Sequence, residues 1–154
     1  DPYARLILIG GYEGMEKYHI YLKTLLTELD LADVTFAKHI TLSDLVAYYS
    51  IADAFLCMSE HEGFCIPLLE AVHFNVPIFA FNACAIPETL SGGGILILKK
   101  DFKQIAELIK LVLENDKTKT KLVQEQKEKM RVFERQDLKR QLETILQKFI
   151  TTKD

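Results

Sequence analysis

Short apolar segments alternate with amphipathic segments over the first two thirds of the chain. Each apolar segment is only a few residues long and is bounded by glycine, proline, asparagine or charged residues, which is typical of strands buried in a parallel sheet. The first of them, Arg5 to Ile9, is expected to be fully buried. The pattern predicts five strands, over residues 5–9, 34–36, 54–58, 77–80 and 95–98.

The segments between the strands carry apolar residues at helical spacing. Pro67 stands where a proline is tolerated, in a first helical turn, and Asn75 can take the left-handed position that ends that helix. The helices are predicted over residues 16–30, from Ser43 or Asp44 through Tyr49, over 67–74 and over 87–90.

After Asp101 the pattern is helical to the end of the chain, with predicted helices over 102–113, 118–133 and 138–149. Strands that alternate with helices pair in parallel through right-handed crossovers. The fold class is therefore α/β. We expect a Rossmann-like open parallel sheet of about five strands, with helices on both faces and a helical C-terminal tail over 101–154.

Length and composition narrow the class of protein. The chain has 154 residues, 49% of them hydrophobic, which suits one domain with a sizeable core. The net charge of −3 argues against a nucleic-acid partner. No apolar run is long enough for a membrane span, and the start shows no signal-peptide pattern. The start also lacks a methionine, so we interpret the sequence as a piece of a longer chain.

Cysteine and histidine usage favours a protein without metal. Cys57, Cys65 and Cys84 are odd in number and widely spaced, which argues against a disulfide framework and a Cys-x-x-Cys metal site. The four histidines form no His-Glu-x-x-His helix. We therefore expect reduced thiols, a cytoplasmic location and no metal. Cys57 and Cys84 are expected in or near the core, and Cys65 lacks a histidine that could activate it as a nucleophile.

Ligands of open parallel sheets bind beyond the carboxyl ends of the strands, which directs attention to the loops 10–14, 38–41, 59–66 and 82–88. The third loop leads into a helix whose N-terminus offers amide donors and a partial positive charge to a phosphate. Gly63 lets the backbone approach a ligand closely. Glu62 and Glu70 could accept hydrogen bonds from sugar hydroxyls. The alternative is that both glutamates merely favour a helix start.

Residues 59–71, Ser-Glu-His-Glu-Gly-Phe-Cys-Ile-Pro-Leu-Leu-Glu-Ala, resemble the Glu-x7-Glu motif of the fourth family of glycosyltransferases, which are retaining enzymes of the GT-B fold. The strand ahead of the motif, 52–56, and the segments 77–78 and 86–88 behind it also match at the expected distances. The resemblance covers residues 2–100 closely. Glycines frequent in the family are replaced here by Lys38, Cys65, Asn75 and the pair Cys84-Ala85.

The resemblance implies a role for each matching position. Glu62 would contact hydroxyls of the transferred sugar as the catalytic residue, and Glu70 would hold the ribose hydroxyls. Ile40 would line the pocket of the base. The diphosphate and the sugar would face four backbone amides, those of Gly63, Phe64, Cys65 and Ile66. Secondary candidates are His61, for which we favour a solvent-facing position, and Gly10 and Gly11, for which we favour a plain turn.

By the same resemblance, residues 1–154 would form the C-terminal donor-binding domain of a GT-B enzyme, truncated at its N-terminal side. The parent would transfer a sugar from a nucleoside-diphosphate sugar to an acceptor hydroxyl, in polysaccharide or lipopolysaccharide synthesis, without cofactor or metal. The acceptor domain and the cationic diphosphate clamp would lie upstream, so the isolated chain is expected to be inactive. The alternative is a non-catalytic nucleotide-binding or interaction module; a dehydrogenase is disfavoured because Gly-x-Gly-x-x-Gly is absent.

The resemblance also implies that the first strand of the family domain is missing. We expect the gap to close by direct pairing of residues 5–9 with 54–58, or to be filled by a segment of a partner molecule. The apolar last helix could pack on the sheet or form a homodimer through Leu142, Leu146 and Phe149. Peripheral attachment at the inner face of the membrane is a further option for this helix.

Overall fold

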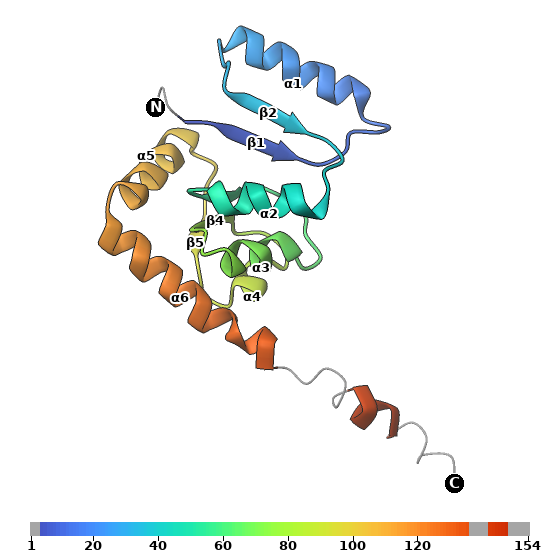
Figure 1. The fold of residues 1–154 in the computed structure, drawn as a ribbon, viewed down its shortest axis with the longest axis vertical. Helices are drawn as coiled ribbons and strands as arrows, with labels where there is room; N and C mark the ends of the chain where they lie inside the picture. Colours follow the sequence, from blue (N-terminus) through green and yellow to red (C-terminus); the bar gives the residue numbers. More distant parts are fainter. Residues whose placement is uncertain (1–3, 136–141, 148–154) are drawn as a thin grey trace. The chain divides into compact units, whose positions relative to one another are not determined.

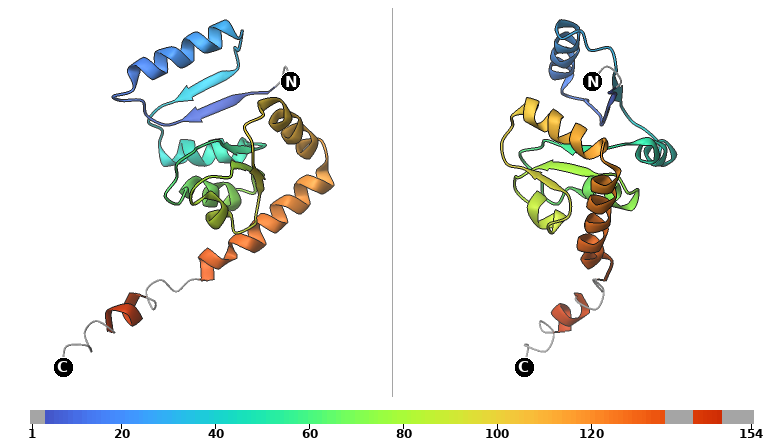
Figure 2. Two further views of the ribbon diagram at one scale, coloured as in Figure 1. Left: turned by 180° about the vertical axis from the view of Figure 1, so that it is seen from behind. Right: turned by 90° about the vertical axis from the view of Figure 1, so that its left-hand side faces the viewer.

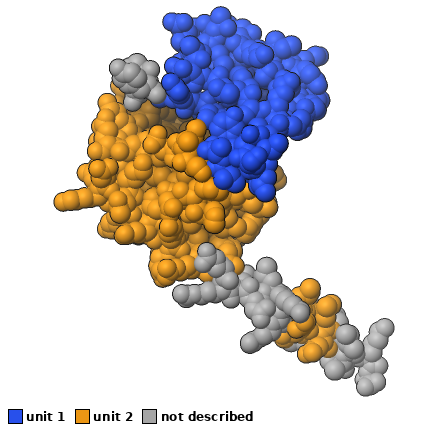
Figure 3. Space-filling model, viewed as in Figure 1, with its two compact units in different colours: residues 1–48 blue, residues 49–154 orange. Residues whose placement is uncertain are grey.

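A computed structural model describes residues 4–135 and 142–147 (Figure 1). The chain forms two compact units, residues 1–48 and 49–154, which are coloured separately in Figure 3. Both are built from parallel strands connected by helices, so the α/β class predicted from the sequence is confirmed. Each of the five predicted strands is present, within one or two residues of its expected bounds.

The first unit contains β1 (Leu6–Ile9), α1 (Glu16–Glu28) and β2 (Val34–Ala37). β1 and β2 pair in parallel, from Leu6 opposite Val34 to Ile9 opposite Ala37. The interior of this unit is aromatic. The buried ring of His19 stacks on Tyr12 with ring centroids 3.8 Å apart and meets the edge of Phe36 at 4.8 Å.

Two predictions about β1 were wrong. β1 is not fully buried, because Leu6, Leu8 and Ile9 are 46%, 39% and 44% exposed. It also does not pair with β3 (Phe55–Cys57): its ladder is with β2, and the ladder of β3 is with β4 (Ile78–Phe81). The expected pairing assumed that an open edge would be buried and costly. An edge that water can reach carries no such cost, so nothing forces the two strands together.

The helix α2 (Leu42–Ile51) begins one or two residues earlier than predicted because Thr41 caps it. The Thr41 hydroxyl accepts a hydrogen bond from the Asp44 amide at 3.2 Å, and the Asp44 carboxylate accepts one from the Thr41 amide at 3.0 Å. This reciprocal pair is a capping box with aspartate in place of glutamate. The Asp44 carboxylate also accepts a hydrogen bond from the Thr41 hydroxyl at 2.7 Å, and this bond, followed by the bond from the Thr41 amide, lowers the pKa of Asp44. The carboxylate therefore remains charged at the positive end of the helix.

The second unit contains a three-stranded parallel sheet in the order β3-β4-β5, with β4 in the centre. Its remaining elements are α3 (Ile66–His73), α4 (Ile86–Leu90), β5 (Ile95–Ile97), α5 (Phe102–Leu113) and α6 (Asp116–Arg135). Asn75 ends the α3 segment with φ of 63°, the left-handed conformation expected for it. Ile78, Phe79 and Ala80 of β4 are completely buried, so the core of this unit is centred on β4.

Helices cover both faces of this sheet (Figure 2). Side chains alternate between the faces of a strand. Phe79 packs with Ile105 and Val112 of α5 on one face. Ile78 points to the other face, where a Cβ built on Gly94 would touch both Ile78 and Leu90 of α4. The five strands thus form two parallel ladders, and the three-stranded one is enclosed as expected for a Rossmann-like fold.

Gln126 attaches α6 to the sheet, within the helix that the sequence predicted over residues 118–133. Its side chain is completely buried. The side-chain carbonyl accepts a hydrogen bond from the Ile78 amide at 2.9 Å, and the side-chain amide donates to the Val76 carbonyl at 3.0 Å. These two bonds satisfy backbone groups at the entrance to β4.

The backbone of Gly93 packs closely against the backbone of Gln126 in α6. A Cβ at this position would lie 2.9 Å from the Gln126 Cα and 3.2 Å from the Leu90 carbonyl oxygen, both of them backbone atoms. We therefore expect Gly93→Ala to lower the free energy of unfolding by about 1–3 kcal/mol, the usual cost of overpacking. Gly63→Ala is the matched control, because a Cβ there meets no atom within 4 Å. Equal urea midpoints for the two variants would contradict the close packing of α6.

The last predicted helix falls partly outside the described residues. Residues 142–147 are helical, and Leu142, Ile145 and Leu146 in it are 50% exposed or more. Phe149, named with them as a dimer contact, lies outside the described range, so the expected packing or dimerisation of this helix stays a prediction. Of the helices that the structure describes, none has the length and apolar character needed to cross a membrane.

Candidate functional site

The loop between β3 and α3 ends at a helix N-terminus with free backbone donors. Cys65 is the N-cap residue and adopts a left-handed conformation with φ of 64°, and Pro67 stands in the first turn as predicted. No side chain caps the helix. Within the described part of the chain, the amides of Gly63, Phe64 and Cys65 donate to no protein acceptor. Such amides are available to an anion, whose charge the helix N-terminus also favours.

The two glutamates of the motif flank these amides. Glu62 precedes the turn and is half-buried, and Glu70 lies one turn into α3 and is also half-buried. Glu70 is four residues beyond Ile66, so both lie on the same face of the helix. Neither carboxylate is withdrawn into the core. The structure therefore keeps both carboxylates on the segment that carries the free amides, where a ligand of the amides could meet them.

Tyr49, which the sequence analysis treated only as an apolar helix position, holds Glu70. Its hydroxyl donates a hydrogen bond to the Glu70 carboxylate at 2.9 Å. The ring is buried and stacks on Phe74, with centroids 5.4 Å apart. Burial, and then the hydrogen bond to Glu70, raise the pKa of Tyr49 far above its usual value, so the hydroxyl stays a donor. The only sequence signal was a tyrosine on an otherwise apolar helix face.

The neighbouring loop, which follows β4, is bonded to the motif loop. Thr89 of α4 is buried, and its hydroxyl donates to the Phe64 carbonyl at 2.6 Å. The Ala85 amide donates to the Glu62 carbonyl at 3.4 Å. These bonds use backbone carbonyls and leave the amides of the motif loop free. Two of the four predicted ligand loops, 59–66 and 82–88, are thus held together at one end of the three-stranded sheet.

Side chains add to this connection. Lys100, just after β5, forms an ion pair with Glu60 at 2.6 Å and lowers the pKa of that carboxyl. The Cys84 thiol donates to the Glu60 carbonyl at 3.4 Å and lies 3.7 Å from His61 Nδ1. His61 is exposed, as predicted. Glu60 and His61 are therefore anchored at the rim of the loop.

The cysteines differ in burial. Cys84 is exposed, so its expected place in or near the core was wrong: it lies in a surface turn with φ of 47°. Cys57 is half-buried, and Cys65 is buried with its sulfur 3.9 Å from that of Cys57. Burial, and next the neighbouring Cys57, raise the pKa of Cys65 to about 12. A thiol that remains protonated is a poor nucleophile, which agrees with the sequence analysis.

The remaining candidates lie in the first unit. Gly10 and Gly11 follow β1, and half-buried Ile40 comes three residues after β2. Because the two strands are parallel and in register, these loops leave from the same edge of the ladder. A Cβ on Gly11 would clash with the Glu13 carboxylate, which binds His39 at 2.8 Å. Gly11 thus lies in a tight polar turn, and whether it also contacts a ligand stays a prediction.

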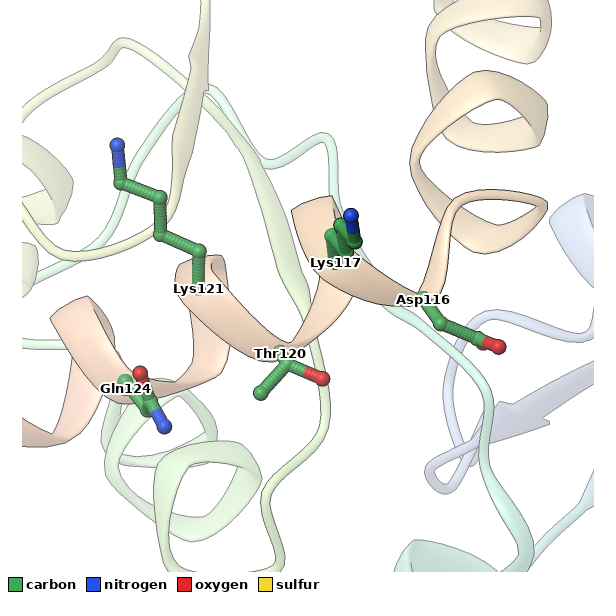
Figure 4. Close-up of a pocket in the computed structure, with 5 residues that line it drawn as sticks. All are labelled: Asp116, Lys117, Thr120, Lys121 and Gln124. Atoms are coloured by element: carbon green, nitrogen blue, oxygen red, sulfur yellow. The ribbon is translucent and has the colours of Figure 1, made fainter.

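A shallow depression along α6 is a weaker candidate (Figure 4). Its lining comes from this one helix: Asp116, Lys117, Thr120, Lys121 and Gln124. Lys121 is 78% exposed and lies 3.8 Å from the Glu125 carboxylate, an ordinary surface pair of successive helical turns. The depression contains none of the free amides or motif glutamates, so we place the functional site at the loop before α3.

The loop before α3 lies in a segment that is similar to known proteins. The family model of group 1 glycosyl transferases matches residues 1–129. The chain belongs to this family. The match contains the whole segment from β1 through α5, including the Glu62–Glu70 motif, so the resemblance to glycosyltransferases drawn from the motif is confirmed at the level of group 1.

Two curated proteins and a solved structure are also similar to the chain. The chain is 31% identical over 111 residues, 71% of its length, to the O-antigen chain mannosyltransferase RfbU of Salmonella typhimurium, and 27% identical over 112 residues to the O-antigen chain mannosyltransferase B of Escherichia coli. The crystal structure of Anabaena Alr3699/HepE in complex with UDP and glucose superposes with a TM-score of 0.78, at 20% identity, over 96% of this chain and 40% of that one. This likeness confirms the Rossmann-like fold. The chain spans about 30% of the length of the two curated relatives.

Proposed function

We propose that the chain forms the nucleotide-sugar-binding part of a retaining glycosyltransferase that moves a sugar from a nucleoside-diphosphate donor to an acceptor hydroxyl. The observation that carries the proposal is the turn at residues 62–66 of a group 1 glycosyl transferase, where free amides at a helix N-terminus lie between two half-buried glutamates. The amides can donate hydrogen bonds to a diphosphate, and the two carboxylates can accept hydrogen bonds from the hydroxyls of two sugars. A helix start that binds no ligand requires neither feature.

In the proposed mechanism, this segment supplies electrostatic stabilisation rather than proton transfer. Charge builds up on the diphosphate as the bond to the sugar breaks. Preorganised amides at the N-terminus of α3 would stabilise that charge without rearrangement, which is the largest contribution in many enzymes. Glu70 would hold the ribose, and Glu62 would orient the transferred sugar. These roles require no metal, and none is assigned to the transfer step.

We propose that the transferred sugar is mannose and that the product is a polysaccharide or lipopolysaccharide chain. Support comes from the names of the two curated relatives, both O-antigen chain mannosyltransferases. We further propose that an acceptor domain completes the site in the full-length protein, of which residues 1–154 are the donor-binding domain. The free thiols of Cys57, Cys65 and Cys84 support a reducing, cytoplasmic location.

The test is calorimetric titration of the full-length protein with UDP, GDP and NAD, followed by transfer assays with the matching mannose and glucose donors. We expect binding of a nucleoside diphosphate, no binding of NAD, and transfer with retention of the anomeric configuration. Binding of a nucleoside diphosphate without any transfer would favour a non-catalytic nucleotide-binding module. No binding of any nucleotide would refute the proposal.

The hydrogen bond from Tyr49 gives a further prediction. Tyr49→Phe keeps the ring that stacks on Phe74 and removes the donor to Glu70. We expect the dissociation constant of the nucleoside diphosphate to rise about three- to tenfold, because a net hydrogen bond contributes about 0.5–1.5 kcal/mol. Tyr48→Phe, on the preceding residue, is the control. A change in kcat with an unchanged nucleotide affinity would show that Tyr49 does not act through the ribose-binding glutamate.

A further inference from the structure

Three metal-ligating side chains converge beside the proposed donor site. The sulfur atoms of Cys57 and Cys65 and a carboxylate oxygen of Glu62 all lie within 4.8 Å of one another. Cys57 ends β3, and Cys65 caps α3, so the strand and the helix bring together two thiols that are eight residues apart in sequence. The sequence predicted no metal because its cysteines are widely spaced and its histidines form no metal-binding motif, and this arrangement of residues uses neither pattern.

The spacing of these atoms fits a tetrahedral thiolate site. Two sulfurs that bind one zinc ion at about 2.3 Å lie about 3.8 Å apart in tetrahedral geometry. The two sulfurs here are 3.9 Å apart, so they can share an ion almost without moving. Glu62 lies on the loop before α3, and its carboxylate oxygen is within 4.8 Å of both sulfurs. Soft thiolates select zinc-like ions over magnesium or calcium.

We propose that Cys57, Cys65 and Glu62 bind a zinc-class divalent cation, with water in the fourth position. Each thiol releases its proton to solvent as its sulfur binds the ion. The ion occupies the Glu62 carboxylate, so it excludes the donor sugar from that group. This second consequence rests on the proposed function, whereas the binding of the ion does not. The site would thus make the protein sensitive to inhibition by zinc.

The test uses cobalt as a spectroscopic probe for zinc. The full-length protein, metal-free and kept reduced with a phosphine, is titrated with Co²⁺ and then with Zn²⁺. We expect an intense thiolate-to-cobalt charge-transfer band that saturates at a single ion per chain and disappears on addition of zinc. Cys65→Gly and Cys57→Ser should abolish this band, and Glu62→Gln should weaken the affinity for zinc by about tenfold or more.

Cys84→Gly is the matched control for Cys65→Gly. Both variants replace a cysteine that has a left-handed backbone conformation, but only Cys65→Gly removes a proposed ligand. We expect the band to remain in Cys84→Gly. Absence of the band in the unmodified protein, or its survival in Cys65→Gly, would overturn the site. In a separate calorimetric arm, zinc should raise the dissociation constant of the donor in the unmodified protein and not in Cys65→Gly. A cobalt band without donor binding would leave the metal site standing and refute the proposed function alone.

Discussion

Replacing Glu62 or Glu70 by glutamine in the full-length protein should lower kcat/KM for sugar transfer about five- to tenfold. Each change replaces a charge-assisted hydrogen bond, worth about 1.5–3 kcal/mol, by a neutral one, worth about 0.5–1.5 kcal/mol, and keeps the size of the side chain. Neither side chain is needed for the core, since both are half-buried and lie at the motif turn. The fold should therefore survive both changes.

The two variants should differ in which kinetic constant moves. Glu70 is proposed to hold the ribose equally in substrate and transition state, so Glu70→Gln should mainly raise KM. Glu62 is proposed to act on the sugar being transferred, so Glu62→Gln should mainly lower kcat. Glu107→Gln, an exposed position on α5, is the control. Near-normal constants in both motif variants would mean that the glutamates only start the helix, the alternative left open by the sequence.

Gln126→Leu should strongly destabilise the second unit. It leaves the Ile78 amide and the Val76 carbonyl buried without partners, and each orphaned group costs about 1–3 kcal/mol. Leucine is close to glutamine in size, so loss of packing volume contributes little. We expect urea unfolding of the second unit to shift to a lower midpoint, with retained secondary structure below the transition.

Gln124→Leu is the control for this experiment, because Gln124 is exposed on the same helix. It carries the same chemical change and should leave the midpoint nearly unchanged. A midpoint of Gln126→Leu equal to that of Gln124→Leu would show that α6 is not fastened to β4 by this side chain. The donor loop would then have to be supported by other contacts, such as the bond from Thr89 to Phe64.

Several elements of the site could be predicted from local chemistry alone. Pro67 in the first turn of α3 and the left-handed Asn75 are confirmed. These features depend on residues close together in the chain. The roles of Glu62 and Glu70 stay predictions. Their proposed roles toward a ligand rest on the family resemblance and on the free amides of the turn.

Other features depended on residues far apart in sequence. Gln126 looked like one more polar residue on a charged helix, and its burial follows only from the place where α6 crosses the start of β4, 48 residues away from Ile78. Tyr49 likewise reaches Glu70 across 21 residues. Side-chain hydrogen bonds of this kind leave no periodic trace in a sequence, because the partner is a single distant atom.

The order of strands and helices, the parallel class and the motif loop were already contained in the periodicity and turn residues of the chain. Local propensity and hydrophobic spacing act over a few residues, and they are sufficient for elements of this length. The pairing of β1 with β2 alone, the exposure of β1 and Cys84, and the meeting of Cys57 with Cys65 and Glu62 were decided in three dimensions. The physical reason is that burial and convergence depend on which surfaces meet, and an apolar or reactive residue is the same in sequence whether or not a neighbour covers it.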